Sequence, residues 1–147
     1  MNTKQLNVLL ADDDQDDRYF FGKALKEISI STKLTAVPDG EQLMSYLSGN
    51  SENLPDVIFL DINMPRKNGF ECLSEIKENE KLKDLPVIMF STTNSQDSIT
   101  SLFKSGAHVY IHKPSNFAQL KEVINHALPI ASGKMVSNSC VKYILNA

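Results

Sequence analysis

Short apolar runs alternate along this chain with segments whose apolar residues recur at helical spacing. The nearly continuous apolar runs are residues 6–11, 56–61 and 87–90, and shorter strand-like segments are residues 33–37 and 108–111. A continuous apolar run is typical of a central strand in a parallel sheet, because such a strand is buried on both faces. Residues 33–37 instead alternate polar and apolar side chains, which favours an edge strand.

Five strand segments, each followed by a helical segment, predict an α/β fold with a parallel sheet and helices on both of its faces. In such sheets ligands bind at the carboxyl ends of the strands. The alternation predicts one domain over residues 1–128, because Pro129, Ser132 and Gly133 interrupt the last helix. We expect residues 129–147 to form a loosely ordered tail, with docking on the domain or on a second subunit as the alternative.

Composition excludes several classes of protein. The 147 residues suit one domain with a hydrophobic core, and 41% hydrophobic and 22% charged residues are ordinary for a soluble globular protein. A formal net charge of −3 without a basic block predicts no nucleic-acid surface. No signal sequence or membrane-length apolar run is present, and the two cysteines are far apart, so we expect a cytoplasmic protein with reduced thiols and no membrane contact.

Acidic, hydroxyl and basic side chains follow the predicted strands. Asp12 and Asp13 end the first apolar run, Asp61 ends another, and Ser91 and Lys113 follow two further strands. Neighbouring carboxylates repel each other unless a cation lies between them, and Mg²⁺ prefers oxygen ligands. Lys113 and the Ser91 hydroxyl would contact phosphoryl oxygens. The pattern therefore predicts a site for a divalent cation and for phosphoryl chemistry.

Five landmarks agree with a known family in type, order and spacing. They are the pair Asp12-Asp13, the segment Asp61-Ile-Asn-Met-Pro65 with Gly69, Ser91, Tyr110 and Lys113-Pro114. Over about residues 5–128 the chain resembles bacterial response-regulator receiver domains of two-component signalling. Its acidic segment 12–18 and the spacing before Phe117 resemble a stand-alone subgroup that includes phytochrome-associated regulators. The resemblance implies a flavodoxin-like, doubly wound, five-stranded sheet of order 2-1-3-4-5.

The resemblance also implies roles for individual residues. Asp61 would be the phosphoacceptor that attacks a phosphohistidine, and Lys113 would contact the phosphoryl group. Asp13, Asp61 and the backbone carbonyl of Asn63 would bind Mg²⁺ directly, with Asp12 helping through a water molecule. The side chain of Asn63 would influence hydrolysis of the aspartyl phosphate. Such a protein catalyses its own phosphorylation and dephosphorylation and is not an enzyme that turns over an external substrate.

A switch and several partners follow from the same resemblance. Ser91 and Tyr110 would form the switch pair, in which the hydroxyl moves toward the phosphate and the ring turns inward. The Lys113–Pro114 bond would be cis. The partners would be a histidine kinase or phosphotransfer protein, and either a downstream protein target or a next carrier in a phosphorelay. A homodimer is a further state to test.

Other interpretations compete with this one. Asp14 and Asp16 are better explained as helix-capping residues, and Tyr110 is equally compatible with plain packing. A Mg²⁺-dependent phosphatase would often carry a second carboxylate where Asn63 stands. A flavodoxin-like cofactor binder would need a loop rich in Ser, Thr and Gly after the first strand, where this chain has aspartates. A degenerate receiver that only binds other proteins would not need the complete set of site residues.

Overall fold

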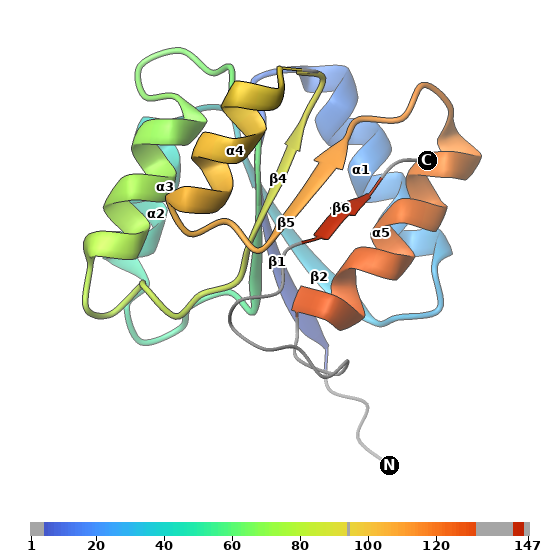
Figure 1. Cartoon of the computed structure of the whole chain (residues 1–147). Helices are drawn as coiled ribbons and strands as arrows, with labels where there is room; N and C mark the ends of the chain where they lie inside the picture. The colour runs from blue at the N-terminus through green and yellow to red at the C-terminus, as the bar shows by residue number, and fades with distance from the viewer. Residues whose placement is uncertain (1–4, 94, 132–142, 146–147) are drawn as a thin grey trace.

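A computed structural model describes residues 5–93, 95–131 and 143–145. Figure 1 shows strands and helices alternating along the chain. The strands are β1 (Leu6–Ala11), β2 (Thr32–Val37), β3 (Val57–Leu60), β4 (Val87–Ser91), β5 (Val109–His112) and β6 (Tyr143–Leu145). The helices are α1 (Gln15–Glu27), α2 (Gly40–Gly49), α3 (Gly69–Glu78), α4 (Gln96–Lys104) and α5 (Phe117–Ala131).

The strands form one parallel sheet in the order β2-β1-β3-β4-β5-β6. The first five strands have the predicted order 2-1-3-4-5, so the predicted fold class is confirmed. β2 lies at the edge, as its alternating pattern indicates, whereas β3 and β4 are buried along their whole length. Because the strands are parallel, the carboxyl ends of β1, β3, β4 and β5 lie side by side at the same end of the sheet.

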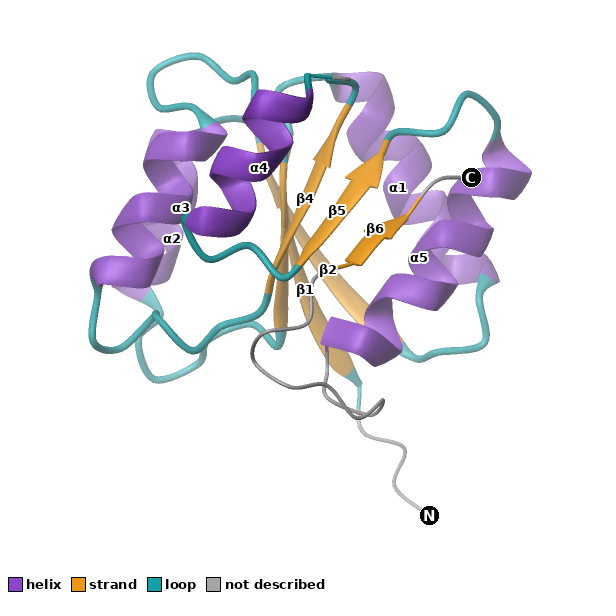
Figure 2. Cartoon of the chain, in the orientation of Figure 1, coloured by secondary structure: helices purple, strands orange, loops and turns teal. Residues whose placement is uncertain are grey.

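The helices cover both faces of the sheet (Figure 2). One hydrophobic cluster joins α1 and α5 to residues such as Val8 and Phe59 of the central strands. The other joins α2, α3 and α4 to residues such as Leu9 and Leu60, which are next to them in sequence and point to the opposite face. Burial on both faces explains why the central strands are continuously apolar.

Polar residues after the strands begin the helices. Asp14 and Asp39 accept hydrogen bonds from backbone N–H groups in the first turns of α1 and α2, at 3.0 and 2.8 Å. The capping function predicted for Asp14 is therefore confirmed. Asn68 and Glu71 form a capping box at the start of α3. These caps fix where each loop leaves the functional edge of the sheet.

The C-terminal segment contributes to the sheet. α5 continues through Pro129 to Ala131, so Pro129 does not end the helix as predicted. Proline lacks a backbone N–H and so leaves one helix hydrogen bond unmade, yet α5 continues for two residues beyond it. β6 pairs with β5 in parallel, with Tyr143 opposite Val109. For residues 143–145 this pairing favours docking over a loose tail, while the expectation for residues 132–142 lies outside the described residues.

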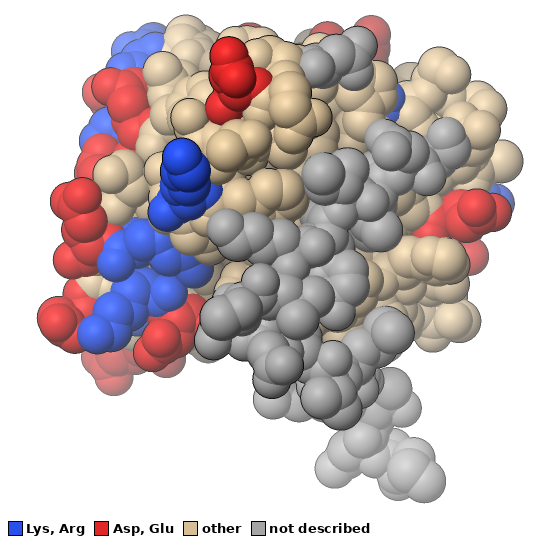
Figure 3. All heavy atoms as spheres, viewed as in Figure 1, with Lys and Arg blue, Asp and Glu red and all other residues tan. Residues whose placement is uncertain are grey.

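The surface carries charges of both signs. In the view of Figure 3 acidic and basic side chains are interspersed at the left of the molecule. Within the described ranges, none of the helices has both the length and the apolar character needed to span a bilayer.

Candidate functional site

The carboxyl ends of β1 and β3 bring three carboxylates together. The backbone N–H of Asp61 donates to the carbonyl of Ala11 at 3.0 Å, which sets Asp61 beside the end of β1. One carboxylate oxygen from each of Asp12, Asp13 and Asp61 lies within 4.8 Å of the others. Asp12 and Asp61 are buried, whereas Asp13 is exposed. The group consists of hard oxygen ligands and is open on one side, so it could hold a metal ion.

Lys113 brings the positive charge to this group. It follows β5, and its backbone N–H donates to the carbonyl of Ser91 at the end of β4, at 2.8 Å. Its ammonium Nζ lies 2.8 Å from Oδ2 of Asp12 and 3.3 Å from Oδ2 of Asp61. The predicted site residues on β1, β3, β4 and β5 are thus brought to one place by the order of the strands.

Asp17 is a third partner of Lys113 that the sequence interpretation missed. Its Oδ2 lies 2.9 Å from the Lys113 ammonium. Asp17 stands in the first turn of α1, where an acidic residue is already explained by the favourable end of the helix dipole. The sequence offers no signal that separates Asp17 from an ordinary acidic residue in a first helical turn.

Burial dominates the electrostatics of the acceptor. It raises the pKa of Asp61 from its usual 3.8 to about 6, with attraction by Lys113 opposing the rise and repulsion by Asp12 adding to it. Burial raises the pKa of Asp12 as well. For Lys113 burial lowers the pKa, but hydrogen bonds to Asp12 and Asp17 outweigh it, so the net shift is upward. Near neutral pH this geometry holds a cationic lysine against carboxylates that are costly to ionise.

Ser91 and Tyr110 lie next to the acidic group. Ser91 is buried, and its Oγ accepts a hydrogen bond from the backbone N–H of Thr93 at 3.4 Å. The Tyr110 ring is also buried, and its hydroxyl donates to the carbonyl of Thr93 at 2.7 Å. Tyr110 therefore points inward and is tied to the loop that follows Ser91.

Tight packing constrains the loop after Asp61. A Cβ on Gly69 would lie 2.3 Å from the carbonyl oxygen of Asp61, so only glycine fits this close approach. The N–H of Gly69 donates to the carbonyl of Ile62 at 2.8 Å, which folds the loop back on itself. Asn63, the predicted carbonyl ligand, lies within this loop, and its side chain is exposed.

One prediction about the backbone is wrong. The Lys113–Pro114 bond was expected to be cis, but the described residues contain no cis peptide bond. The trans form is the intrinsic preference of a bond before proline, by about 0.5–1 kcal/mol. The expectation came from resemblance alone and had no support in the residues themselves.

Comparisons with known proteins agree with this geometry. Residues 8–125 match the family described as the response regulator receiver domain. The response regulator Rcp1 of Synechocystis is 32% identical over 121 residues, which cover 80% of this chain and 82% of Rcp1. The rice two-component response regulator ORR13 is 33% identical, covering 82% of this chain and 96% of the relative.

Solved structures extend the similarity to three dimensions. The crystal structure of the phosphorylated cyanobacterial phytochrome response regulator RcpA has a TM-score of 0.81 and 30% identity, covering 90% of this chain and 98% of RcpA. The Mn²⁺-bound form of Rcp1 has a TM-score of 0.78 and 27% identity, covering 90% of this chain and 99% of Rcp1. The matched span, the strand order and the acidic group agree, and the chain belongs to the response regulator receiver domain family.

Proposed function

We propose that Asp61 accepts a phosphoryl group from the phosphohistidine of a histidine kinase or of a phosphotransfer protein. The observation that carries this proposal is the ammonium of Lys113 between the buried carboxylates of Asp12 and Asp61. An ammonium held beside an acceptor carboxylate can neutralise charge on an incoming phosphoryl group. Family membership supports the reaction class, because phosphorylation of an aspartate is typical of receiver domains.

The chain's own residues would perform the transfer. With a pKa of about 6, Asp61 is mostly ionised above neutral pH and can act as a nucleophile. A carboxylate oxygen of Asp61 would form the bond to phosphorus while the bond from phosphorus to the histidine nitrogen breaks, and the protonated ring leaves as neutral imidazole. Lys113 and the hydroxyl of Ser91 would contact the phosphoryl oxygens. The same residues would favour self-dephosphorylation by water, with no external substrate turned over.

The acidic group would hold Mg²⁺. Asp13, Asp61 and the backbone carbonyl of Asn63 would be direct ligands, and Asp12 would act through a water molecule. Carboxylate and carbonyl oxygens without nitrogen or sulfur ligands suit this ion. When bound, Mg²⁺ would neutralise charge on the phosphoryl oxygens.

Ser91 and Tyr110 would pass the change to a protein surface. Tyr110 lies on β5, next to the β6 edge, and its hydroxyl is bound to the loop after β4. A movement of Ser91 toward a phosphoryl group would shift this loop and the adjoining start of α4. The surface around α4, β5 and α5, where β6 pairs with β5, would then bind a downstream protein, a next phosphorelay carrier or a second copy of the chain.

Residues 1–128 would form the receiver domain that accepts the phosphoryl group. Residues 129–147 would form a C-terminal tail that takes no part in this reaction. The family match over residues 8–125 supports this division, although β6 of the tail joins the sheet. We place the reaction in the cytoplasm, where thiols such as that of the free and buried Cys72 stay reduced.

Acetyl phosphate with Mg²⁺ tests the proposal directly. Mass spectrometry should detect one added phosphoryl group, and borohydride trapping should locate it at Asp61. Asp61→Asn should abolish the modification. Asp56→Asn is the matched control, because Asp56 lies at the other end of β3 and accepts the backbone N–H of Asn7 at 2.7 Å. An unmodified wild-type protein, or equal modification of Asp61→Asn, would refute the proposal.

A further inference from the structure

The ammonium of Lys113 has no free hydrogen-bond donor in this structure. An ammonium group carries three N–H donors. Three carboxylates lie within hydrogen-bond distance of it, those of Asp12, Asp17 and Asp61, at 2.8, 2.9 and 3.3 Å. A phosphoryl oxygen that Lys113 is to contact must therefore displace one of these three partners.

The three carboxylates differ in how easily they can be released. Asp12 is fully buried, and its other oxygen accepts the backbone N–H of Asp14 at 3.0 Å, so loss of the lysine would leave a buried carboxylate without its ion pair. Asp61 has the longest contact, at 3.3 Å, but it stays beside Lys113 after the reaction because the phosphoryl group would be bonded to its own carboxylate. The side chain of Asp17 is 40% exposed, so water can solvate it after release.

We propose that Asp17 is a positioning residue, which holds Lys113 before phosphorylation and is exchanged for a phosphoryl oxygen when Asp61 is phosphorylated. The proposal rests on the acceptor function of Asp61. Asp17 stands outside the group of Asp12, Asp13 and Asp61 that could hold a metal ion. Its effect therefore acts through Lys113, and its removal changes competition for the ammonium while the carboxylates of the metal group stay in place.

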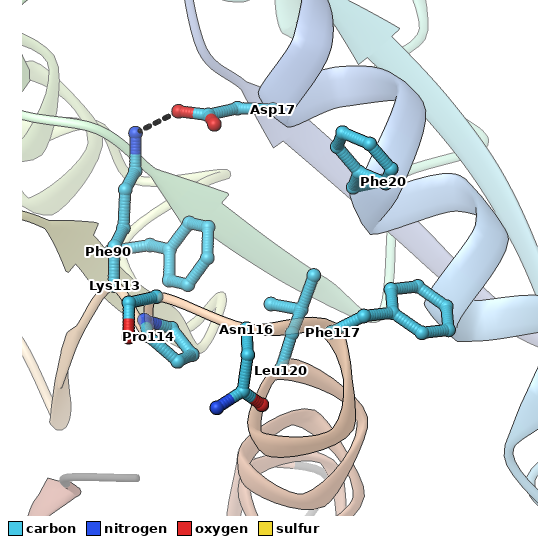
Figure 4. Close-up of a pocket in the computed structure, with 9 residues that line it drawn as sticks. Asp17, Phe20, Phe90, Lys113, Pro114, Asn116, Phe117 and Leu120 are labelled. Atoms are coloured by element: carbon cyan, nitrogen blue, oxygen red, sulfur yellow. Dashed lines mark hydrogen bonds and ion pairs between the residues drawn. The ribbon is translucent and has the colours of Figure 1, made fainter.

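Asp17 and Lys113 also line a cavity of about 270 Å³ between α1 and the β5–α5 loop. Figure 4 shows their ion pair at one end of the cavity, with Phe20 and Phe117 farther along it. The exchange would remove this bridge and leave the carboxylate of Asp17 without its cation at the edge of the cavity. Phosphorylation would thereby change the charge that the surface of α1 presents beside this cavity.

Phosphorylation kinetics of matched variants test the exchange. Asp17→Asn should increase the rate of phosphorylation by acetyl phosphate about two- to fivefold, the range that a partly exposed ion pair is worth. Asp16→Asn removes the same charge from the same helical turn, but Asp16 is exposed and makes no ion pair among the described residues, so its rate should stay near wild type. Asp17→Glu keeps the carboxylate and should restore the wild-type rate.

A structural measurement gives a second readout. In the complex with beryllofluoride and Mg²⁺, Lys113 Nζ should contact a fluorine and lie beyond ion-pair distance of Asp17. An intact ion pair between Asp17 and Lys113 in that complex would overturn the exchange, and so would equal rates for Asp17→Asn and Asp16→Asn. In either case, phosphorylation of the wild type would still support the acceptor function of Asp61. Failure of the wild type to accept phosphate would refute both.

Discussion

Replacing the proposed phosphoacceptor should make the metal-free protein more stable. Asp61 is only 6% exposed, and burial raises its pKa from 3.8 to about 6 in spite of the attraction by Lys113. Ionising Asp61 therefore costs more free energy in the folded protein than in the unfolded chain. Asn has nearly the same shape and carries no charge, so Asp61→Asn removes the cost of burying the ionised form.

The size of the gain follows from the pKa. A change of one in a pKa corresponds to about 1.4 kcal/mol, so the rise at Asp61 gives an upper limit of about 3 kcal/mol at pH 7.5. We expect Asp61→Asn to raise the free energy of unfolding by about 1–3 kcal/mol. Because the pKa is raised on folding, the stability that wild-type Asp61 contributes is complete below 3.8 and is lost as pH rises through about 6. The advantage of the variant should therefore shrink toward zero between pH 7.5 and pH 4.

Urea unfolding followed by circular dichroism, in buffer freed of divalent cations, measures this difference at pH 7.5, 6 and 4. Asp56→Asn is the control, because Asp56 accepts a backbone N–H and should show no such gain. A variant at Asp61 that is less stable than wild type at pH 7.5 would show that the contact with Lys113 outweighs burial. A gain that does not depend on pH would show that titration of Asp61 is not its cause.

Two further substitutions test the packing and the charges around the site. Gly40→Ala should lower the free energy of unfolding by about 1–3 kcal/mol, because its Cβ would lie 2.1 Å from the carbonyl oxygen of Lys67. Gly49→Ala, whose Cβ would have nothing within 4 Å, should raise the free energy of unfolding by about 0.5–1 kcal/mol. Thermal melts compare the two variants. Lys113→Met should lower the free energy of unfolding by about 3 kcal/mol at pH 7.5, since it leaves buried carboxylates without their cation. Lys121→Met breaks an exposed ion pair and should lower it by less than about 1 kcal/mol. Urea titrations measure both losses, and equal losses would argue against a special role for the buried lysine.

The sequence was sufficient for those features that depend on burial and strand order. The apolar runs located the central strands, and parallel order then brought Asp12, Asp61, Ser91 and Lys113 to one edge, as the structure has them. These predictions succeed because the carboxyl ends of parallel strands all lie at the same end of the sheet.

Features that depend on side-chain reach or on pairing at a distance were not predictable. Asp17 looks like an ordinary first-turn acid, and only the position of the Lys113 side chain shows that the two residues pair. β6 has only three residues, and its strand character depends on the edge of β5 to which it pairs. The Lys113–Pro114 bond is trans, in line with the intrinsic preference of bonds before proline and not with the family resemblance.

Burial, with a smaller addition from repulsion by Asp12, makes Asp61 costly to ionise in the folded protein, and the same cost would couple the site to cations. Asp12, Asp17 and Asp61 contact the ammonium of Lys113, and a carboxylate oxygen of Asp13 lies within 4.8 Å of those of Asp12 and Asp61, so these side chains together carry a net negative charge when all four carboxylates are ionised. The unfolded chain does not assemble this group, and a divalent cation that binds only the folded state stabilises it by mass action. Wild type should therefore gain more stability from Mg²⁺ than Asp61→Asn does, because that substitution relieves the cost and removes a ligand together. A divalent cation bound by the folded protein would thus offset the cost of burying the ionised carboxylate of Asp61.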